Sequence, residues 1–68
     1  MESIHLKDEF IKLGQLLKAT GMVESGVEAK IVIQDGEVTL NGAVETQRGK
    51  KVVAGDVVSF NGKQIKVL

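Results

Sequence analysis

The spacing of apolar residues changes along the chain, and each spacing predicts a different element. Residues 3–7 alternate, with Ile4 and Leu6 on one side, which is typical of a short strand. From Leu13 onward, apolar residues recur every three or four positions, as on one face of a helix. Either Asp8 caps this helix or the segment as far as Ile11 is extended first. The apolar stripe contains Phe10, Leu13, Leu16 and Leu17, and the opposite side contains Lys12, Gln15 and Lys18.

Gly21 is expected to end this helix in the left-handed conformation, and a second helix has a sharper start signal. Ser25 and Glu28 form a capping box, in which the serine accepts from a helical amide and the glutamate reaches back. We expect this helix to cover residues 26 to about 35 and to stop at Gly36. Because apolar residues cover most of its circumference, we expect it to be mostly buried. Its one polar stripe contains Gly26, Lys30 and Gln34.

Two Asn-Gly pairs, at 41–42 and 61–62, predict two tight β-hairpins. The flanking strands are expected at 38–40, 43–45, 57–60 and 63–67. Pairing across the second turn places four apolar residues on one face, namely Val58, Phe60, Ile65 and Val67. Residues 46–51 form a basic loop between the hairpins. The predicted class is α+β, with two short helices packed on a small, largely antiparallel sheet.

Composition narrows the possible functions. A chain of 68 residues is enough for a single domain, expected to span residues 1–68. The sequence has no cysteine, which excludes disulfides and thiolate metal sites. It has no apolar run near the ~20 residues of a membrane span and no secretion signal, so a cytoplasmic protein with no membrane partner is expected. His5 has no second histidine beside it, so we expect no metal site, no cofactor and no catalytic residue.

Charge is unevenly distributed along a chain whose net charge is zero. Residues 1–46 contain four lysines and eight acidic residues, a net charge of −4. Residues 47–68 contain five basic residues and Asp56 alone, a net charge of +4. This asymmetry favours a charged partner, although ordinary solvation of the surface would also explain it.

The order of several segments resembles the S-four RNA-binding domain, a family named after a protein of the small ribosomal subunit. These segments are Lys-Leu-Gly-Gln-Leu-Leu-Lys at 12–18, Gly21, Ser-Gly-Val-Glu-Ala-Lys at 25–30, Gly-Glu-Val-Thr-Leu-Asn-Gly at 36–42 and Gly-Asp-Val-Val at 55–58. The resemblance implies an αL motif, a helix-turn-helix followed by a hairpin, as in the small stand-alone bacterial members. Gly26 and Gly14 depart from the family, which often has arginine and aspartate at these positions.

The resemblance also implies which residues contact RNA. Family members carry basic residues on both helices and in the loop after the hairpin, which here correspond to Lys12, Lys18, Lys30, Arg48, Lys50 and Lys51. Ser25 and Gly26 are added because the amides at the start of a helix attract anions. Each of these residues also has a purely structural explanation, as a solvated lysine, a solvated turn or a helix cap.

The predicted function is therefore binding of structured RNA, plausibly ribosomal RNA or tRNA, without catalysis. Ribosomal particles are expected as possible partners, and the sequence gives no clear signal for oligomerisation. Two phenylalanines are the only aromatic residues, and both are expected on apolar faces, which disfavours binding of single strands. A small protein–protein interaction adaptor is the alternative function.

Overall fold

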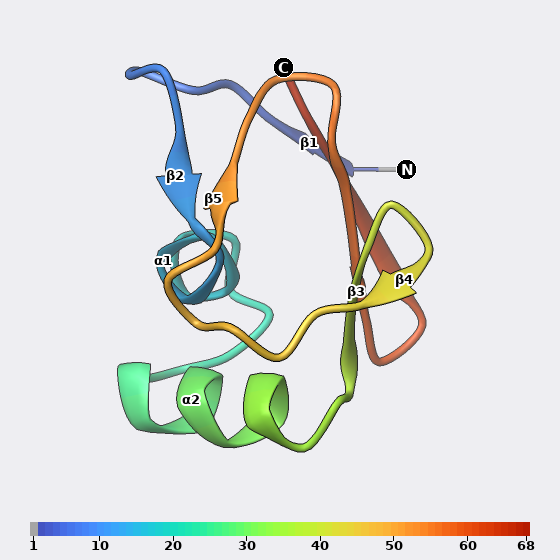
Figure 1. Cartoon of the computed structure of the whole chain (residues 1–68). Helices are drawn as coiled ribbons and strands as arrows, with labels where there is room; N and C mark the ends of the chain where they lie inside the picture. The colour runs from blue at the N-terminus through green and yellow to red at the C-terminus, as the bar shows by residue number, and fades with distance from the viewer. Residues whose placement is uncertain (1) are drawn as a thin grey trace.

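The computed structural model describes residues 2–68 and contains two helices and seven short strands (Figure 1). The helices lie beside the larger sheet, and β2 and β5 form a separate ribbon above α1 in this view. The elements are β1 (Glu2–Ile4), β2 (Ile11–Lys12), α1 (Leu13–Ala19), α2 (Gly26–Gln34), β3 (Val38–Leu40), β4 (Ala43–Val44), β5 (Lys51–Val52), β6 (Val57–Phe60) and β7 (Lys63–Val67).

The larger sheet has the strand order β1-β7-β6-β3-β4. Its β3–β4, β3–β6 and β6–β7 pairs are antiparallel, whereas β1 pairs in parallel with β7. The second sheet is the antiparallel pair β2–β5. The predicted α+β class is confirmed, while the parallel pair and the second sheet were not predicted. The strand expected at residues 3–7 is shorter, because pairing with β7 ends at Ile4.

Both predicted hairpins are confirmed. Asn41 and Asn61 have φ of 53° and 52°, and the glycines after them also have positive φ, as a two-residue type I′ turn requires. Val58 pairs with Ile65, so the two side chains share a face. Val58, Ile65 and Val67 are buried, and Phe60 is partly buried. The basic loop is one residue shorter than expected, because Lys51 belongs to β5.

The first helix is preceded by an extended segment, the second of the two starts considered. Leu13, Leu16 and Leu17 are fully buried and anchor α1 to the core. Gly21 follows the helix with φ of 76°, as predicted. The placement of Phe10 on the helical stripe was wrong, since Phe10 precedes β2 and its side chain is 37% exposed.

The second helix begins and ends where the sequence indicates. Ser25 Oγ accepts from Glu28 N at 3.1 Å, but Glu28 Oε1 accepts from Glu24 N rather than from the serine amide. The predicted burial was wrong, because α2 packs on the core through one side only, and Val27 and Ile31 are 70% and 53% exposed. No helix within residues 2–68 is long and apolar enough to cross a membrane.

Candidate nucleic-acid interface

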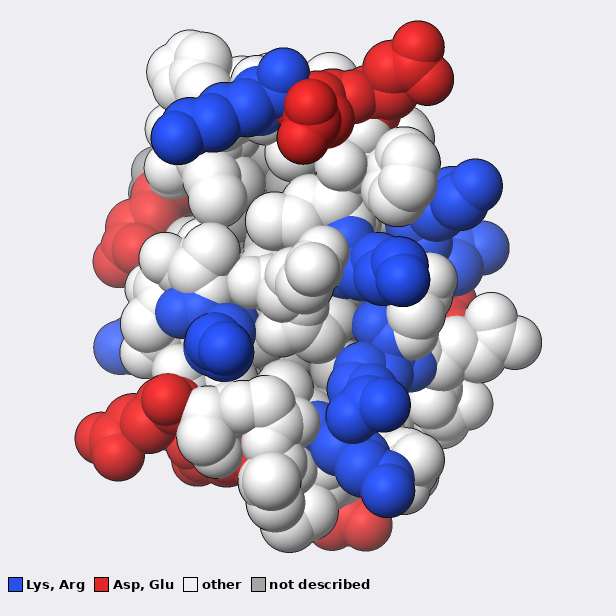
Figure 2. Space-filling model, turned by 90° about the vertical axis from the view of Figure 1, so that its left-hand side faces the viewer, with Lys and Arg blue, Asp and Glu red and all other residues white. Residues whose placement is uncertain are grey.

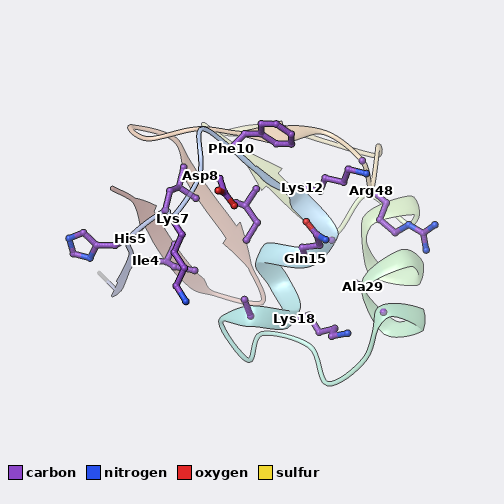
Figure 3. Close-up of a pocket in the computed structure, with 16 residues that line it drawn as sticks. Ile4, His5, Lys7, Asp8, Phe10, Lys12, Gln15, Lys18, Ala29 and Arg48 are labelled. Atoms are coloured by element: carbon purple, nitrogen blue, oxygen red, sulfur yellow. The ribbon is translucent and has the colours of Figure 1, made fainter.

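A groove runs between the segment that follows β1, helix α1, the start of α2 and the turn at Arg48 (Figure 3). Its floor is formed by side chains that also pack against the core, among them Ile4, Leu6 and Ile11. The residues that line it are Ile4, His5, Leu6, Lys7, Asp8, Phe10, Ile11, Lys12, Gly14, Gln15, Lys18, Ala19, Gly26, Ala29, Arg48 and Gly49.

Basic residues dominate the charge of this groove. Four of its lining residues are basic, and Asp8 is the one acidic residue among those described. Figure 2 shows Lys and Arg side chains gathered on this side of the molecule, with acidic side chains toward its margins. A protein without net charge therefore has one face on which positive charge is concentrated, as a polyanion requires.

Backbone hydrogen bonds hold Arg48 at the groove. Gly14 N donates to Arg48 O at 3.0 Å, and Leu13 N donates to Lys50 O at 2.9 Å. These two amides are at the start of α1, where a helix has no internal partners for them. Lys12, the N-cap residue, contributes no side-chain cap. The loop that carries Arg48 and Lys50 thus caps α1 with its carbonyls, which leaves its basic side chains free to contact a ligand.

Gly14 allows the Arg48 side chain to lie close to α1. A Cβ atom at this position would be 2.7 Å from Arg48 Cγ, a distance that would force the arginine to move. The absence of a side chain at Gly14, where the family often has aspartate, therefore makes room for Arg48 beside the groove.

Lys12 and Lys51 lie directly opposite each other in the β2–β5 pair. Like charges at opposite positions of a sheet destabilise it. The Nζ atom of Lys51 is 4.8 Å from the centroid of the Phe10 ring, a cation–π contact that offsets part of this cost. This local fold therefore keeps two cations close together, Lys12 lining the groove and Lys51 on the Phe10 ring beside it.

The start of α2 is a weaker anion site than its amides alone suggest. Gly26 lines the groove, but Ser25 Oγ is engaged with Glu28 N. The Glu28 carboxylate is bonded to Glu24 N, just before the helix, and its negative charge would repel a phosphate there.

The structure brings together some of the predicted site residues and separates others. Lys12, Lys18, Gly26 and Arg48 line the groove, whereas Ser25, Lys30, Lys50 and Lys51 do not. Lys30 is exposed on α2, and Lys51 lies on Phe10.

Sequence reasoning did not assign four polar groove residues to the site, namely His5, Lys7, Asp8 and Gln15. Gln15 could have been found, because it follows Lys12 on the same polar side of α1. Lys7 could not, since the path of the chain between β1 and β2 has no sequence signature. Within residues 2–68, no cluster of three or more His, Cys, Asp or Glu side chains could hold a metal ion.

Comparison with known proteins finds a family and relatives of similar length. Residues 4–68 match the model of the S4 (S-four) domain. Escherichia coli K12 YbcJ, named as a candidate RNA-binding protein, is 47% identical over 62 residues, which cover 91% of this chain and 89% of YbcJ. Bacillus subtilis RlbA, named as a candidate ribosome maturation protein, is 39% identical over 59 residues, which cover 87% of this chain and 83% of RlbA.

Other similarities extend to a larger enzyme and to a solved structure. A tyrosine–tRNA ligase of Burkholderia lata is 40% identical over 62 residues, which cover 91% of this chain but only 15% of the ligase. The solution structure of E. coli YbcJ superimposes with a TM-score of 0.76 at 45% identity, covering all of this chain and 87% of YbcJ. That structure is described as revealing an αL motif involved in RNA binding.

Proposed function

This chain belongs to the S4 domain family, and from this premise we propose that it binds structured RNA along the groove and catalyses no reaction. The relatives named for RNA binding and ribosome maturation support this proposal. The similarity to tyrosine–tRNA ligases covers a small part of those enzymes, so it supports a shared binding module rather than a shared reaction.

The observation that carries the proposal is the position of Lys12. This lysine is the N-cap residue of α1, where the helix dipole favours a negative charge. It also faces Lys51 across the β2–β5 pair, where the two like charges repel. A cation that is unfavourable for the isolated fold becomes favourable when a phosphate binds between Lys12 and Lys51.

Phosphate recognition explains a preference for structured RNA. The basic residues Lys12, Lys18 and Arg48 are attached to β2, α1 and a loop bonded to α1, so their spacing is set by the fold. Fixed cations fit phosphates whose own spacing is fixed by a helix or junction. We propose ribosomal RNA or tRNA in the cytoplasm as the target, within or beside a ribosomal particle.

Reversal of one charge tests this function. Arg48→Glu retains a Cγ atom beside Gly14 as well as the carbonyl that accepts from Gly14 N, so the fold should persist. The loss of a charge-assisted hydrogen bond of about 1.5–3 kcal/mol should weaken binding of a ribosomal RNA fragment roughly 10- to 100-fold. Lys63→Glu in β7 makes the same charge change outside the groove lining and should have a much smaller effect. Fluorescence anisotropy measures both, and equal effects would contradict the proposed site.

A protein–protein interaction is the second candidate, and one observation favours it. Val27 and Ile31 are one helical turn apart on α2 and are largely exposed. Neighbouring exposed apolar side chains can mark a contact with another protein. If the chain bound no RNA in the anisotropy measurement, this surface would become the leading candidate.

A further inference from the structure

The two sides of the groove differ in chemistry. The side formed by residues 4–11 contributes four apolar side chains, from Ile4, Leu6, Phe10 and Ile11, together with His5, Lys7 and Asp8. The other side contributes the basic side chains of Lys12, Lys18 and Arg48. Figure 3 shows Phe10 along one rim with Lys12 next to it, and Arg48 on the side of α2. Ile4, Leu6 and Ile11 also pack against the core, whereas Phe10 does not, so of these four the fold leaves only the Phe10 ring without a role in the core.

Phe10 is the residue that distinguishes the side formed by residues 4–11. Its ring is 37% exposed and does not belong to the hydrophobic core, whereas the other phenylalanine, Phe60, packs against that core. An aromatic side chain outside the core stabilises the fold less than a buried one would. The ring instead lines the groove and contacts the Lys51 ammonium at 4.8 Å from its centroid. An aromatic surface beside a cation is the combination on which nucleobases stack next to their phosphates.

The position of Asp8 also indicates that the groove near Phe10 suits a base better than a phosphate. Asp8 belongs to the segment before Phe10 that lines this side, and Figure 3 shows its carboxylate turned toward the groove. A carboxylate repels phosphate but accepts hydrogen bonds from the amino and imino groups of a base. The Asp8 carboxylate is therefore unfavourable for a phosphate placed next to it and favourable for a base edge, although Lys7 lines the same side.

We propose that the Phe10 side of the groove holds one unstacked base of the bound RNA, while the phosphates that flank this base contact Lys12 and Arg48. This inference rests on the proposed RNA-binding function and narrows its substrate class. The preferred RNA has a single unpaired nucleotide, such as a bulge, adjacent to a helix. A long single strand is not preferred, because Phe10 is the one Phe, Tyr or Trp side chain among the described residues that line the groove, and successive bases need several such platforms.

Two RNA hairpins that differ by one nucleotide test the inference. One is fully paired, and the other has a single bulged 2-aminopurine. The wild-type protein should bind the bulged hairpin about tenfold more tightly, as expected for one stacked base. Binding should also quench the fluorescence of 2-aminopurine, because the base stacks on the Phe10 ring.

Phe10→Leu should remove both the preference and the quenching, because leucine is apolar but has no ring to stack on. The substitution lies outside the core, so the thermal melt should remain cooperative. Phe10→Trp should retain both signals.

Lys51→Gln is the matched control, because it removes the contact with the Phe10 ring but leaves the ring in place. It should weaken binding of the two hairpins by the same factor and leave their ratio unchanged. Equal wild-type affinity for both hairpins, or an unchanged preference in Phe10→Leu, would overturn the base site while leaving the proposed RNA binding intact. Absence of binding to either hairpin would overturn both.

Discussion

Lys12 combines two electrostatic costs that the fold alone does not require. It precedes the first turn of α1, and it lies opposite Lys51 in a two-stranded sheet. Near a helix N-terminus an anion is worth about 0.3–1 kcal/mol, and a favourable cross-strand pair contributes roughly 0.2–1 kcal/mol. A positive charge that lowers the stability of the free protein is expected at a binding site, where a bound anion compensates for it.

Lys12→Glu should separate these two effects. We expect the free energy of unfolding to rise by about 0.5–2 kcal/mol, because the introduced carboxylate would face Lys51 and would favour the helix N-terminus. Affinity for RNA should fall at the same time. Urea denaturation and anisotropy titration measure the two quantities on one preparation. A variant that is less stable than the wild type would show that Lys12 serves the fold.

The Asn41 residue of the family-like segment has a structural role. Its Nδ2 donates to Asp56 Oδ1 at 2.9 Å, and its Oδ1 accepts from Val57 N at 2.8 Å. The other Asp56 oxygen accepts from Val53 N at 2.9 Å. These bonds join the first hairpin to the turn before β6. The Gly-Glu-Val-Thr-Leu-Asn-Gly and Gly-Asp-Val-Val segments of the resemblance therefore maintain the fold, whereas the segment at 12–18 also lines the groove.

At the scale of elements, the cap of α2 is formed by a side chain and that of α1 by a loop. Ser25 Oγ satisfies Glu28 N, so the start of α2 is a local property of the sequence. The α1 amides of Leu13 and Gly14 are satisfied by carbonyls more than thirty residues away in the chain. The start of α1 consequently depends on the fold being complete.

Ser25→Ala should lower the free energy of unfolding by about 0.5–2 kcal/mol, because Glu28 N would lose its acceptor. This is a substantial share of the stability of so small a domain. RNA affinity measured well below the midpoint of unfolding should change little, since Ser25 does not line the groove. Thermal melts followed by circular dichroism provide the measurement, and an unchanged midpoint would argue against the cap.

The elements with local signals were predictable, and those formed by distant partners were not. Asn-Gly turns, a serine cap and the glycine after each helix predict both hairpins and both helix ends. The pairing of β1 with β7 and of β2 with β5 joins segments about forty to sixty residues apart, and no local pattern specifies such partners. The burial of α2 was overestimated because apolar residues cover most of its surface but the core contacts one side.

The residues of the candidate site also divide into those that the sequence indicates locally and those that depend on distant parts of the chain. Basic residues on α1 and in the loop could be identified from the sequence, and Lys12, Lys18 and Arg48 meet at the groove. The positions of the Lys7 side chain and of the exposed Phe10 ring depend on the path of the chain between β1 and β2. Residues 5–10 contain no pattern that would specify this path. The position of Lys51 opposite Lys12 also depends on the pairing of β5 with β2.

For the whole molecule, zero net charge and a basic face predict selective rather than general binding of nucleic acids. If four to six basic residues contact phosphates, the slope of log K against log salt concentration should be about −3 to −5. Affinity measured from low to physiological salt gives this slope. A value near zero would contradict a phosphate-dominated interface.

At fixed salt, a folded ribosomal fragment should outcompete an unstructured oligonucleotide of equal length.

Amide chemical-shift mapping during titration with a folded RNA fragment tests the central claim most directly, because it locates the contact without any substitution. The account predicts the largest shifts at the start and polar side of α1, at Gly26 and at 48–51, with smaller changes in β6 and β7. Shifts confined to the hairpin of β6 and β7, or to the exposed side of α2 around Val27 and Ile31, would contradict it.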